Sequence, residues 1–560
     1  MNTQQAIACS TFFLLGLTLF VSPTAAQVID LGPSDPALFV DVINSPSDPD
    51  IASFTTIGSG VQLNVSAGGS VGDNVVAITS EVNISGGSIG DDFEARVGSV
   101  VNLSGGSIGN SFGAEFGSEI NISGGTFGAD FFNDSSFGST GLADGSVELI
   151  GGEFQLNGAA FSSSTISIAR ADVFTGTLAD GSTFVLAGDD ISDVQLTTAT
   201  LPTLDLSPIV VSTSNPNLPS GLRTGQTLTL QNGGELGDDF EIVDSLFNVD
   251  GGRLGEGLGA VNSVVNVTNG SVGRDFDAFG SEVNISGGSV GDSFDAHPSS
   301  VVNISGGSVG DGLDVTDRGV VNISGGSVGN GLSAAGTGVV NISGGTVGNL
   351  GDFQDGGSLN FSGGSAGTGL SLDEGTVANI SGGSLGSFSA NIDSLVNISG
   401  GSVGNFSSND GSVVNISGGS IVEFANVGDR GVVNISGGTF GVGGPAFNAL
   451  FGFDAFAGSE INLFGSDFVL DGVLLDNLVI DEAFTILDRD VILSGLLAGG
   501  SAFSFDLSST SDFLNNSVSF FDPDATLTVT LASSVPEPGS LMLLGLGGVA
   551  LLGRRRKTCC

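Results

Sequence analysis

Short segments in which apolar and polar residues alternate recur along most of the chain. In Val321-Asn322-Ile323-Ser324 the apolar residues are β-branched and alternate with polar ones, as in a strand that buries one face. Gly325-Gly326 follows, and glycine permits the positive φ of a tight corner. A second apolar position comes next, and a third holds Phe276 or Leu313 in other copies. Each repeat therefore predicts three short strands joined by glycine corners.

The period of this repeat is nearly constant through the second half of the chain. Its Asn position recurs every 18 or 19 residues, at Asn248, Asn266, Asn284, Asn303, Asn322, Asn341, Asn360, Asn379, Asn397, Asn415 and Asn434. A constant period of this length predicts one solenoid turn per repeat. We therefore predict an all-β fold, a parallel β-helix or β-solenoid, whose Val, Ile and Phe side chains stack inside at about 4.8 Å per turn.

The chain contains this plan twice, in two tandem modules. One array covers about residues 61–150 and the other about 227–463. Each is followed by matching sequence, 154–158 with 468–472 and 176–184 with 495–503, which we expect to cap the open edge of the coil. The predicted domains are a signal peptide (1–26), two solenoid modules with C-terminal caps (27–215 and 216–534) and a sorting segment (535–560). The Pro-rich residues 201–219 are the expected junction.

Both ends of the chain carry features of export. Residues 11–21 are apolar but too few to span a bilayer, which takes about 20, so they predict a secretory signal peptide cut before Gln27. The C-terminus runs from Pro536-Glu537-Pro538 through an apolar segment, 541–552, to Arg554-Arg555-Arg556-Lys557. Such a basic cluster is expected to stay cytoplasmic. The alternatives are an N-terminal membrane anchor and an ordinary tail anchor.

The C-terminal arrangement resembles the PEP-CTERM sorting signal of bacterial surface proteins. In that family an exosortase-type membrane protease cuts near the motif and releases the protein to the surface or matrix. The resemblance covers about 26 residues and implies an exosortase partner, transient membrane anchoring and a secreted or cell-surface location reached through the inner membrane. The residues that match the motif are Pro536, Glu537, Pro538, Arg554, Arg555 and Arg556.

The charge of the chain narrows the range of partners. It has 12 basic and 60 acidic residues, a formal net charge of −48. The sorting segment holds four of the basic residues and one acid, so eight arginines face 59 acids in the rest of the chain, a net charge of −51. This balance excludes nucleic acid as a partner, because phosphate binding needs Lys and Arg. It favours solubility and attraction to cations.

The candidate chemistry is sparse, and we predict no catalytic and no metal residues. His297 is the only histidine and falls in an expected surface loop, so the chain lacks the set of residues that a catalytic triad requires. The three cysteines lie in the signal peptide and behind the basic cluster, which leaves no disulfide framework. We expect no cofactor. Ca²⁺ is the one candidate, because Gly-Gly-Ser-Val-Gly-Asp is similar to calcium-binding β-roll repeats. Asp292 and Asp311 stack as acids after that glycine, but the later turns hold Asn, Thr or Ser there.

The Asn column has several possible roles. The column that includes Asn284, Asn303, Asn322, Asn341 and Asn360 faces away from Val and Ile. Its amides either form a structural ladder of hydrogen bonds or present a polar lattice that binds a glycan or, less favoured, ice. Asn-x-Ser is also a glycosylation sequon. We predict an exported, non-catalytic structural or adhesive protein. The alternatives are a matrix protein that binds extracellular polysaccharide and, less favoured, a polysaccharide-active enzyme, which would need carboxylates grouped with Arg or Lys on one face, or a pair of carboxylates.

Overall fold

The fold is described from a computed structural model of the chain. It describes residues 27–31, 55–114, 117–127, 146–169, 172–187, 191–213, 219, 221–441, 452–510 and 520–532. The predicted signal peptide and the sorting segment from residue 535 lie outside these ranges. Every helix or strand among the described residues is a β-strand, which confirms the all-β class. In the same ranges, no helix has the length and apolar character needed to cross a membrane.

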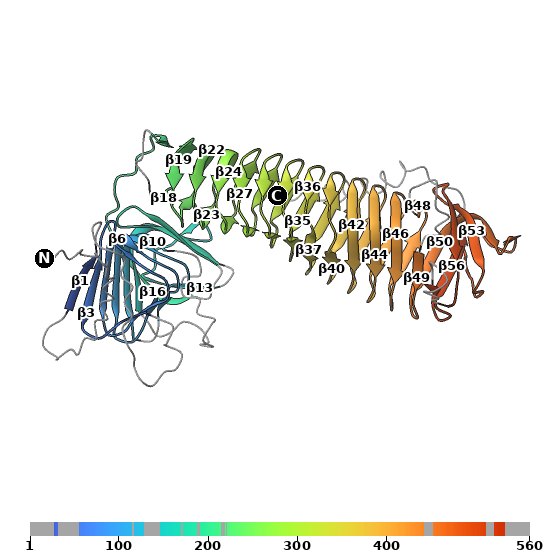
Figure 1. The fold of residues 1–560 in the computed structure, drawn as a ribbon, viewed down its shortest axis with the longest axis horizontal. Coiled ribbons are helices and arrows are strands. Elements are labelled where there is room, and N and C mark those ends of the chain that lie inside the picture. The colour runs from blue at the N-terminus through green and yellow to red at the C-terminus, as the bar shows by residue number, and fades with distance from the viewer. Residues whose placement is uncertain are drawn as a thin grey trace, which may run out of the picture. The chain divides into compact units, whose positions relative to one another are not determined.

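From β26 (Glu282–Ile285) to β40 (Leu370–Leu372) each turn of the second array contains three short strands, and in several other turns two of the three are joined into one longer strand. In one turn the three strands are β26, β27 (Ser289–Val290) and β28 (Phe294–Ala296). Each strand pairs in parallel with its equivalent in the next turn (Figure 1). The register places Asn284 beside Asn303. This register confirms a parallel β-solenoid with turns of 18–19 residues.

The second array repeats this pairing from turn to turn. The strands that carry its Asn column are β22 (Leu246–Leu254), β24 (Val264–Val272), β26, β29 (Val301–Ile304), β32 (Val320–Ile323), β35 (Val339–Ile342), β38 (Ser358–Phe361), β41 (Val377–Ile380), β43 (Leu395–Ile398), β45 (Val413–Ile416), β47 (Val432–Ile435) and β50 (Glu460–Leu470). From β24 to β50 each pairs with the next in parallel and without a register shift.

The core consists of columns of like side chains. Val283, Ile285, Phe294 and Ala296 are fully buried, and their equivalents in neighbouring turns are buried as well. The rings of Phe276 and Phe294 stack with centroids 4.4 Å apart and planes 1° from parallel. Every turn therefore removes the same apolar side chains from water, and this burial is the main favourable term for folding.

The Gly-Gly corner has a steric explanation. A Cβ added at Gly325 would lie 2.4 Å from the carbonyl oxygen of Ser305 in the preceding turn, and Gly326 has a φ of +73°. The same contact, at 2.2–2.4 Å, recurs at Gly306, Gly325, Gly344, Gly363, Gly382, Gly400, Gly418 and Gly437. The first glycine therefore allows close approach of successive turns, and the second allows the left-handed backbone.

The first array begins earlier than the repeat pattern predicted. Its main sheet has the order β1 (Gln27–Leu31), β3 (Val61–Val65), β6 (Glu81–Ile89), β8 (Val100–Ile108), β10 (Glu119–Phe127) and β11 (Ser146–Leu156). A smaller sheet contains β2 (Thr55–Ile57), β5 (Val75–Ala77), β7 (Glu94–Ala95) and β9 (Gly113–Ala114). β1 pairs in parallel with β3, although residues 32–54 between β1 and β2 carry no repeat. That interruption hid β1 from the sequence analysis.

The second array also begins inside the segment predicted to be a junction. β17 (Ile209–Val211) pairs in parallel with β19 (Thr227–Gln231). The sheet therefore starts within residues 201–219 and before the predicted boundary at 216. Only three β-branched residues form this strand, between prolines, so it has too little pattern to be recognised.

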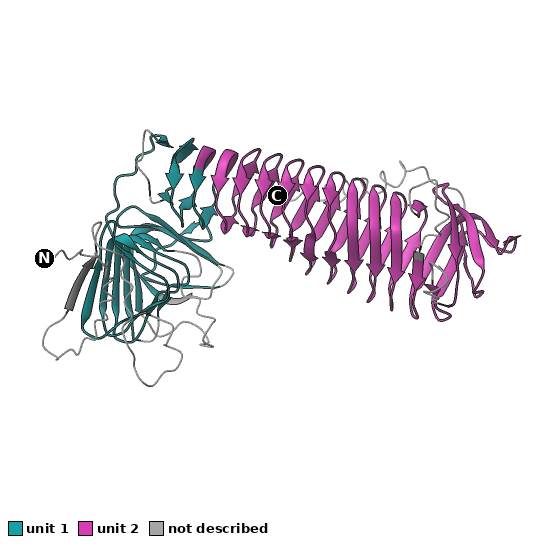
Figure 2. Cartoon of the chain, in the orientation of Figure 1, with its two compact units in different colours: residues 1–247, 253–263 teal, residues 248–252, 264–560 magenta. Residues whose placement is uncertain are grey.

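The chain divides into two compact units, residues 1–247 with 253–263 and residues 248–252 with 264–560 (Figure 2).

Each array ends, at the matching sequences, in a cap that mixes antiparallel and parallel strands. After β11, the first cap consists of β12 (Ala159–Ala160), β13 (Thr165–Ile168), β14 (Val173–Leu178), β15 (Thr183–Ala187) and β16 (Ile191–Thr198). After β50, the second cap consists of β51 (Val473–Leu474), β52 (Ala483–Thr485), β53 (Ile492–Leu497), β54 (Ala502–Asp506), β55 (Phe520–Phe521) and β56 (Thr526–Leu531). In both caps a hairpin, β14–β15 or β53–β54, folds back on the last long strand.

The corner glycines give a first prediction. Gly325→Ala should lower the free energy of unfolding by about 1–3 kcal/mol, because the new methyl group meets the backbone of the preceding turn. Gly237→Ala is the control, because a Cβ there has no atom within 4 Å, and it should change stability by no more than about 0.5 kcal/mol. Urea unfolding followed by circular dichroism measures both. Equal effects would show that close approach of the turns does not set the glycine position.

Candidate functional site

The Asn column forms a continuous ladder of side-chain hydrogen bonds. The Nδ2 of Asn322 donates to the Oδ1 of Asn303 at 2.9 Å, and the Nδ2 of Asn341 donates to Asn322 at the same distance. All five Asn residues singled out from the sequence belong to one ladder, which runs from Asn248 to Asn462. A shorter ladder joins Asn64, Asn83, Asn102 and Asn121 in the first array.

The ladder has a direction and a defined end. Every Nδ2 donates to the preceding turn, so the last amide, Asn462, has a free acceptor position on its Oδ1 unless the cap supplies a donor. Thr528 of β56 supplies it, with its hydroxyl 2.6 Å from that oxygen. Aligned amide dipoles polarise one another, which strengthens such a chain of bonds. The ladder therefore links array and cap, and each amide uses one N–H and one acceptor position in it.

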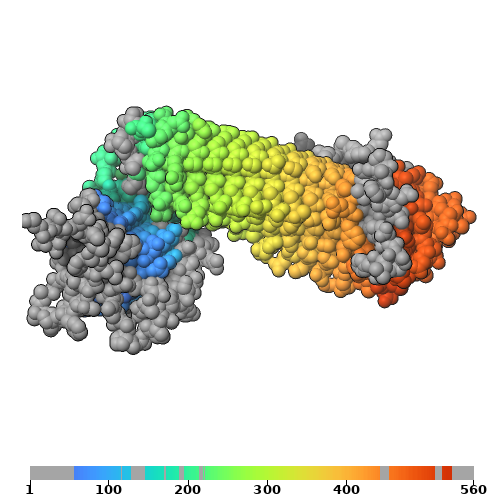
Figure 3. Space-filling view, viewed as in Figure 1, coloured from blue at the N-terminus to red at the C-terminus, as the bar shows by residue number. Residues whose placement is uncertain are grey.

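The other polar positions of the repeat are also committed to the coil. The Ser324 hydroxyl donates to the carbonyl oxygen of Ile304, 20 residues earlier, at 3.4 Å. In the loop column considered for calcium, the Oδ1 of Asp292 accepts the backbone N–H of Asp311, at 2.8 Å. Asp311 in turn accepts from the backbone N–H of Asn330 at 2.6 Å. These carboxylates hold the next turn's backbone. Over the described turns the face seen in Figure 3 is an even surface of stacked side chains.

A second column of acids was not recognised from the sequence. Asp277, Asp295 and Asp314 each follow the buried Phe or Leu of the third strand, and the parallel register places them side by side. The signal was present as Phe-Asp, Phe-Asp and Leu-Asp at the 18–19-residue spacing. It was overlooked because only the column after the glycine was compared.

His297 joins this column. Its Nε2 lies 2.7 Å from the Oδ1 of Asp277, and its ring stacks on Phe279 with centroids 4.0 Å apart. The residue follows β28 as a loop residue, as expected, but only 25% of its side chain is exposed. Asp277, Asp295 and His297 each offer one ligand atom within 4.8 Å of the others. The structure therefore assembles three metal-type donors where the sequence analysis named none.

The electrostatics of this group centre on Asp295. Burial and, next to it, the neighbouring Asp277 carboxylate raise the pKa of its carboxyl to about 6, while His297 opposes the shift. Asp314 and Asp275 add smaller contributions in the same direction. Burial also raises the pKa of Asp239, in the first unit, to about 7, with help from Asp238. These carboxyl groups hold protons more tightly in the folded chain than in the unfolded chain.

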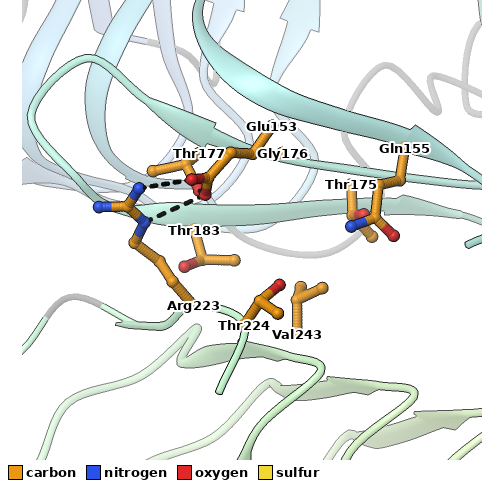
Figure 4. Close-up of a pocket in the computed structure, with 9 residues that line it drawn as sticks. All are labelled: Glu153, Gln155, Thr175, Gly176, Thr177, Thr183, Arg223, Thr224 and Val243. Atoms are coloured by element: carbon orange, nitrogen blue, oxygen red, sulfur yellow. Dashed lines mark hydrogen bonds and ion pairs between the residues drawn. The ribbon is translucent and has the colours of Figure 1, made fainter. Parts of the chain in front are cut away.

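One pocket lies in the first unit, between the hairpin of the first cap and residues 223–243 (Figure 4). Its lining includes Thr175, Thr177 and Thr183. Arg223 crosses it and pairs with Glu153 through two nitrogens, at 2.8 and 3.2 Å. A third guanidinium nitrogen donates to the carbonyl oxygen of Pro202 at 3.0 Å. The ion pair is the main content of this pocket, so we interpret the pocket as a structural contact.

The predicted sorting residues lie outside the described residues, so the evidence on them is sequence comparison. Residues 534–557 match the family profile of the PEP-CTERM protein-sorting motif. The chain carries a PEP-CTERM motif. The PEP-CTERM motif marks an exported protein of the cell surface or extracellular space, sorted by an exosortase. No curated protein matches the chain significantly.

The Asn ladder gives a second prediction. Asn322→Ala should cost about 1–3 kcal/mol of stability, because the Asn303 Oδ1 loses its donor in the ladder and the Asn341 Nδ2 loses its acceptor. Asn322→Asp should cost more at pH 7, because an ionised carboxylate cannot donate and faces the Asn303 oxygen, and part of the loss should be recovered near pH 3. Urea unfolding measures both variants. Asn477→Asp, at an exposed cap position, is the control. If Asn322→Asp is no worse than this control, the ladder does not stabilise the fold.

The acidic column gives a third prediction. Because the pKa of Asp295 is raised from 3.8 to about 6, its contribution to stability is full below pH 4 and is lost as pH rises through 6. Asp295→Asn should therefore flatten the fall in stability between pH 4 and 6 and make the protein more stable than wild type at pH 7. Thermal unfolding at a series of pH values measures this. Asp311→Asn, which keeps an oxygen acceptor for the Asn330 N–H, is the control. A wild-type pH profile in Asp295→Asn would contradict the assignment.

Proposed function

We propose that this exported protein is a non-catalytic structural or adhesive component of the cell surface or extracellular matrix. In this role the second array acts as a stiff spacer that holds the parts of the chain at its two ends apart. The observation that carries the proposal is the Asn ladder, which continues without interruption from Asn248 to Asn462 and ends on Thr528. A side chain that is hydrogen-bonded at every turn resists bending and slippage between turns.

The dimensions of the ladder suit a spacer. Twelve amides are joined by eleven hydrogen bonds. At about 4.8 Å per turn, the ladder alone extends roughly 50 Å. The excess of acids over arginines adds repulsion between copies at low salt, which keeps an exposed surface protein soluble.

The proposal extends to the route and the chemistry of export. We place the exosortase-type protease at the inner membrane as the partner that recognises the Pro536–Pro538 region, with anchoring by residues 541–552 only during sorting. The spacer role needs no cofactor. Ca²⁺ remains a candidate only for loose association with the acidic surface, because Asp292 and Asp311 already bind backbone N–H groups.

A second candidate is binding to an extracellular polysaccharide. Asn360 and Asn379 are exposed, and each amide uses a single N–H in the ladder. The second N–H of each amide is therefore available to a row of sugar hydroxyl groups spaced along the coil. This candidate uses the same column but requires contact with a ligand, so the two roles can be separated.

Two matched deletions test the spacer role. Deletion of residues 303–340 joins Val302 to Asn341, and deletion of residues 341–378 joins Val340 to Asn379; each removes two turns in register. Turn removal should preserve the fold, because each repeat contacts only its neighbours. Both variants should be exported and folded by circular dichroism. Adhesion of the producing cells should fall to the same partial extent in both.

The contrary outcomes of this test are specific. Loss of adhesion in one deletion and full adhesion in the other would place the function in one site and contradict the spacer role. Binding of the exported protein to the host's own polysaccharide, lost in Asn360→Ala with an unchanged fold, would favour the second candidate. Turnover of that polysaccharide would contradict a non-catalytic role altogether.

A further inference from the structure

The two caps have the same topology down to the register of their strands. Gly151 pairs with Leu178 in the first cap, and Gly465 pairs with Leu497 in the second. Further along each of these long strands, β11 and β50, there is a β-bulge. It contains Glu153 in β11 and Asp467 in β50, whose φ angles are 55° and 52°. The remaining pairings, β11–β16 with β50–β56 and β13–β16 with β52–β56, correspond as well. The two caps can therefore be compared residue by residue.

In the first cap the outer face of the hairpin is covered. Thr175, Thr177 and Thr183 are only 2–3% exposed, although they lie on the side opposite the buried Phe174 and Phe184. The residues that cover them belong to the start of the second array, within the same compact unit. Arg223 and Thr224 line the shared pocket with the three threonines (Figure 4). The first cap thus shows what its outer face binds: the first turn of a solenoid.

In the second cap the equivalent face is exposed and more apolar. We call this the terminal face, and it consists of Val469, Leu474, Ile492, Ser494, Leu496 and Ala502, which correspond to Gln155, Ala160, Val173, Thr175, Thr177 and Thr183 of the first cap. Leu474, Ile492 and Leu496 are 55%, 46% and 38% exposed. Exposed apolar residues gathered on one face mark an interaction site.

The two arrays also begin alike. β1 pairs with β3 as β17 pairs with β19, placing Ile29 beside Leu63 and Ile209 beside Leu228. The turn before each of these second strands contains a positive-φ glycine, Gly60 with φ 75° and Gly225 with φ 81°. Ser59 of the first array therefore corresponds to Thr224 of the second. The start of the first array is the surface of this chain that most resembles what the first cap binds.

We propose that the terminal face of one copy binds the start of the first array of a second copy, so that exported molecules join head to tail. This contact uses the terminal face of the second cap, whereas the spacer role rests on the Asn ladder. It adds assembly between copies to the proposed spacer role. The contact within the chain is tethered by the linker and is polar, with the Arg223–Glu153 pair at its centre. Between copies there is no tether, and Gly58 stands in place of Arg223. Leucine and isoleucine in place of polar residues supply the affinity that the tether and ion pair supply within the chain.

Head-to-tail contacts of this kind are heterologous, so they do not close after two copies and instead extend into chains. The net charge opposes such assembly at low ionic strength. Association should therefore increase with salt, whereas assembly through ion pairs would weaken. The direction of the salt dependence therefore distinguishes the proposed apolar contact from an electrostatic one.

Sedimentation velocity of the exported protein over a range of concentration and salt is the first test. We expect species larger than dimers that increase with both variables. Leu496→Glu and Ile492→Asp should each weaken association about tenfold or more. Ile392→Glu, at an exposed position of the second array outside both caps, should leave association unchanged. Monomers under all conditions, or assembly that Leu496→Glu does not affect, would overturn the proposal. Dimers that do not grow further would overturn it too.

Cysteine trapping is the second test, and it does not depend on affinity. Residues 27–534 contain no cysteine, so introduced pairs report without background. Thr183→Cys with Thr224→Cys should close a disulfide within one chain, because both residues line the pocket. The corresponding pair, Ala502→Cys with Ser59→Cys, should give a ladder of covalent multimers under mild oxidation. If that pair stays monomeric while the first pair closes, the proposal fails.

Discussion

The structure depends on one constraint: every residue of a turn must lie one strand spacing from its equivalent in the next turn, about 4.8 Å away. Backbone hydrogen bonds impose that distance, and each side-chain column must then be able to stack on itself. Phenylalanine rings satisfy the constraint by lying parallel, as Phe276 and Phe294 do. Asparagine satisfies it because one amide both donates and accepts. Gly325 satisfies it because nothing larger fits against the Ser305 carbonyl.

The same constraint explains where charge becomes costly. Acids stacked in a column repel one another, so the chain gives them backbone N–H donors, as at Asp292 and Asp311, or a histidine, as at Asp277. Asp295 lies between two other carboxylates and is partly buried, and its raised pKa is the result. The columns that tolerate variation are the ones that face solvent. The chain can therefore be strongly acidic and still stack.

The sequence was sufficient for the parts of the structure that repeat. Strand positions, the inward Val, Ile and Phe columns and the all-β class followed from period-two alternation within an 18–19-residue repeat. The beginnings of both arrays were missed, because β1 and β17 are single strands isolated from the repeat by non-repetitive residues. The Asp277–Asp295–His297 group was missed because Asp277 belongs to the turn before Asp295 and His297, and the register of the strands brings the three together. The matching caps were visible as sequence, but the different exposure of Thr177 and Leu496 depends on what covers each cap.

Hydrogen exchange of the exported protein, read turn by turn by mass spectrometry, tests the central claim most directly. If like side chains and backbone ladders hold each turn to the next, backbone amides in the Val-Asn-Ile-Ser strands from β26 to β47 should exchange slowly and to a similar degree. Protection should decrease only toward the ends of the array. Exchange at the rate of an unfolded chain in the inner turns, or protection confined to the caps, would contradict a continuous ladder as the basis of the fold.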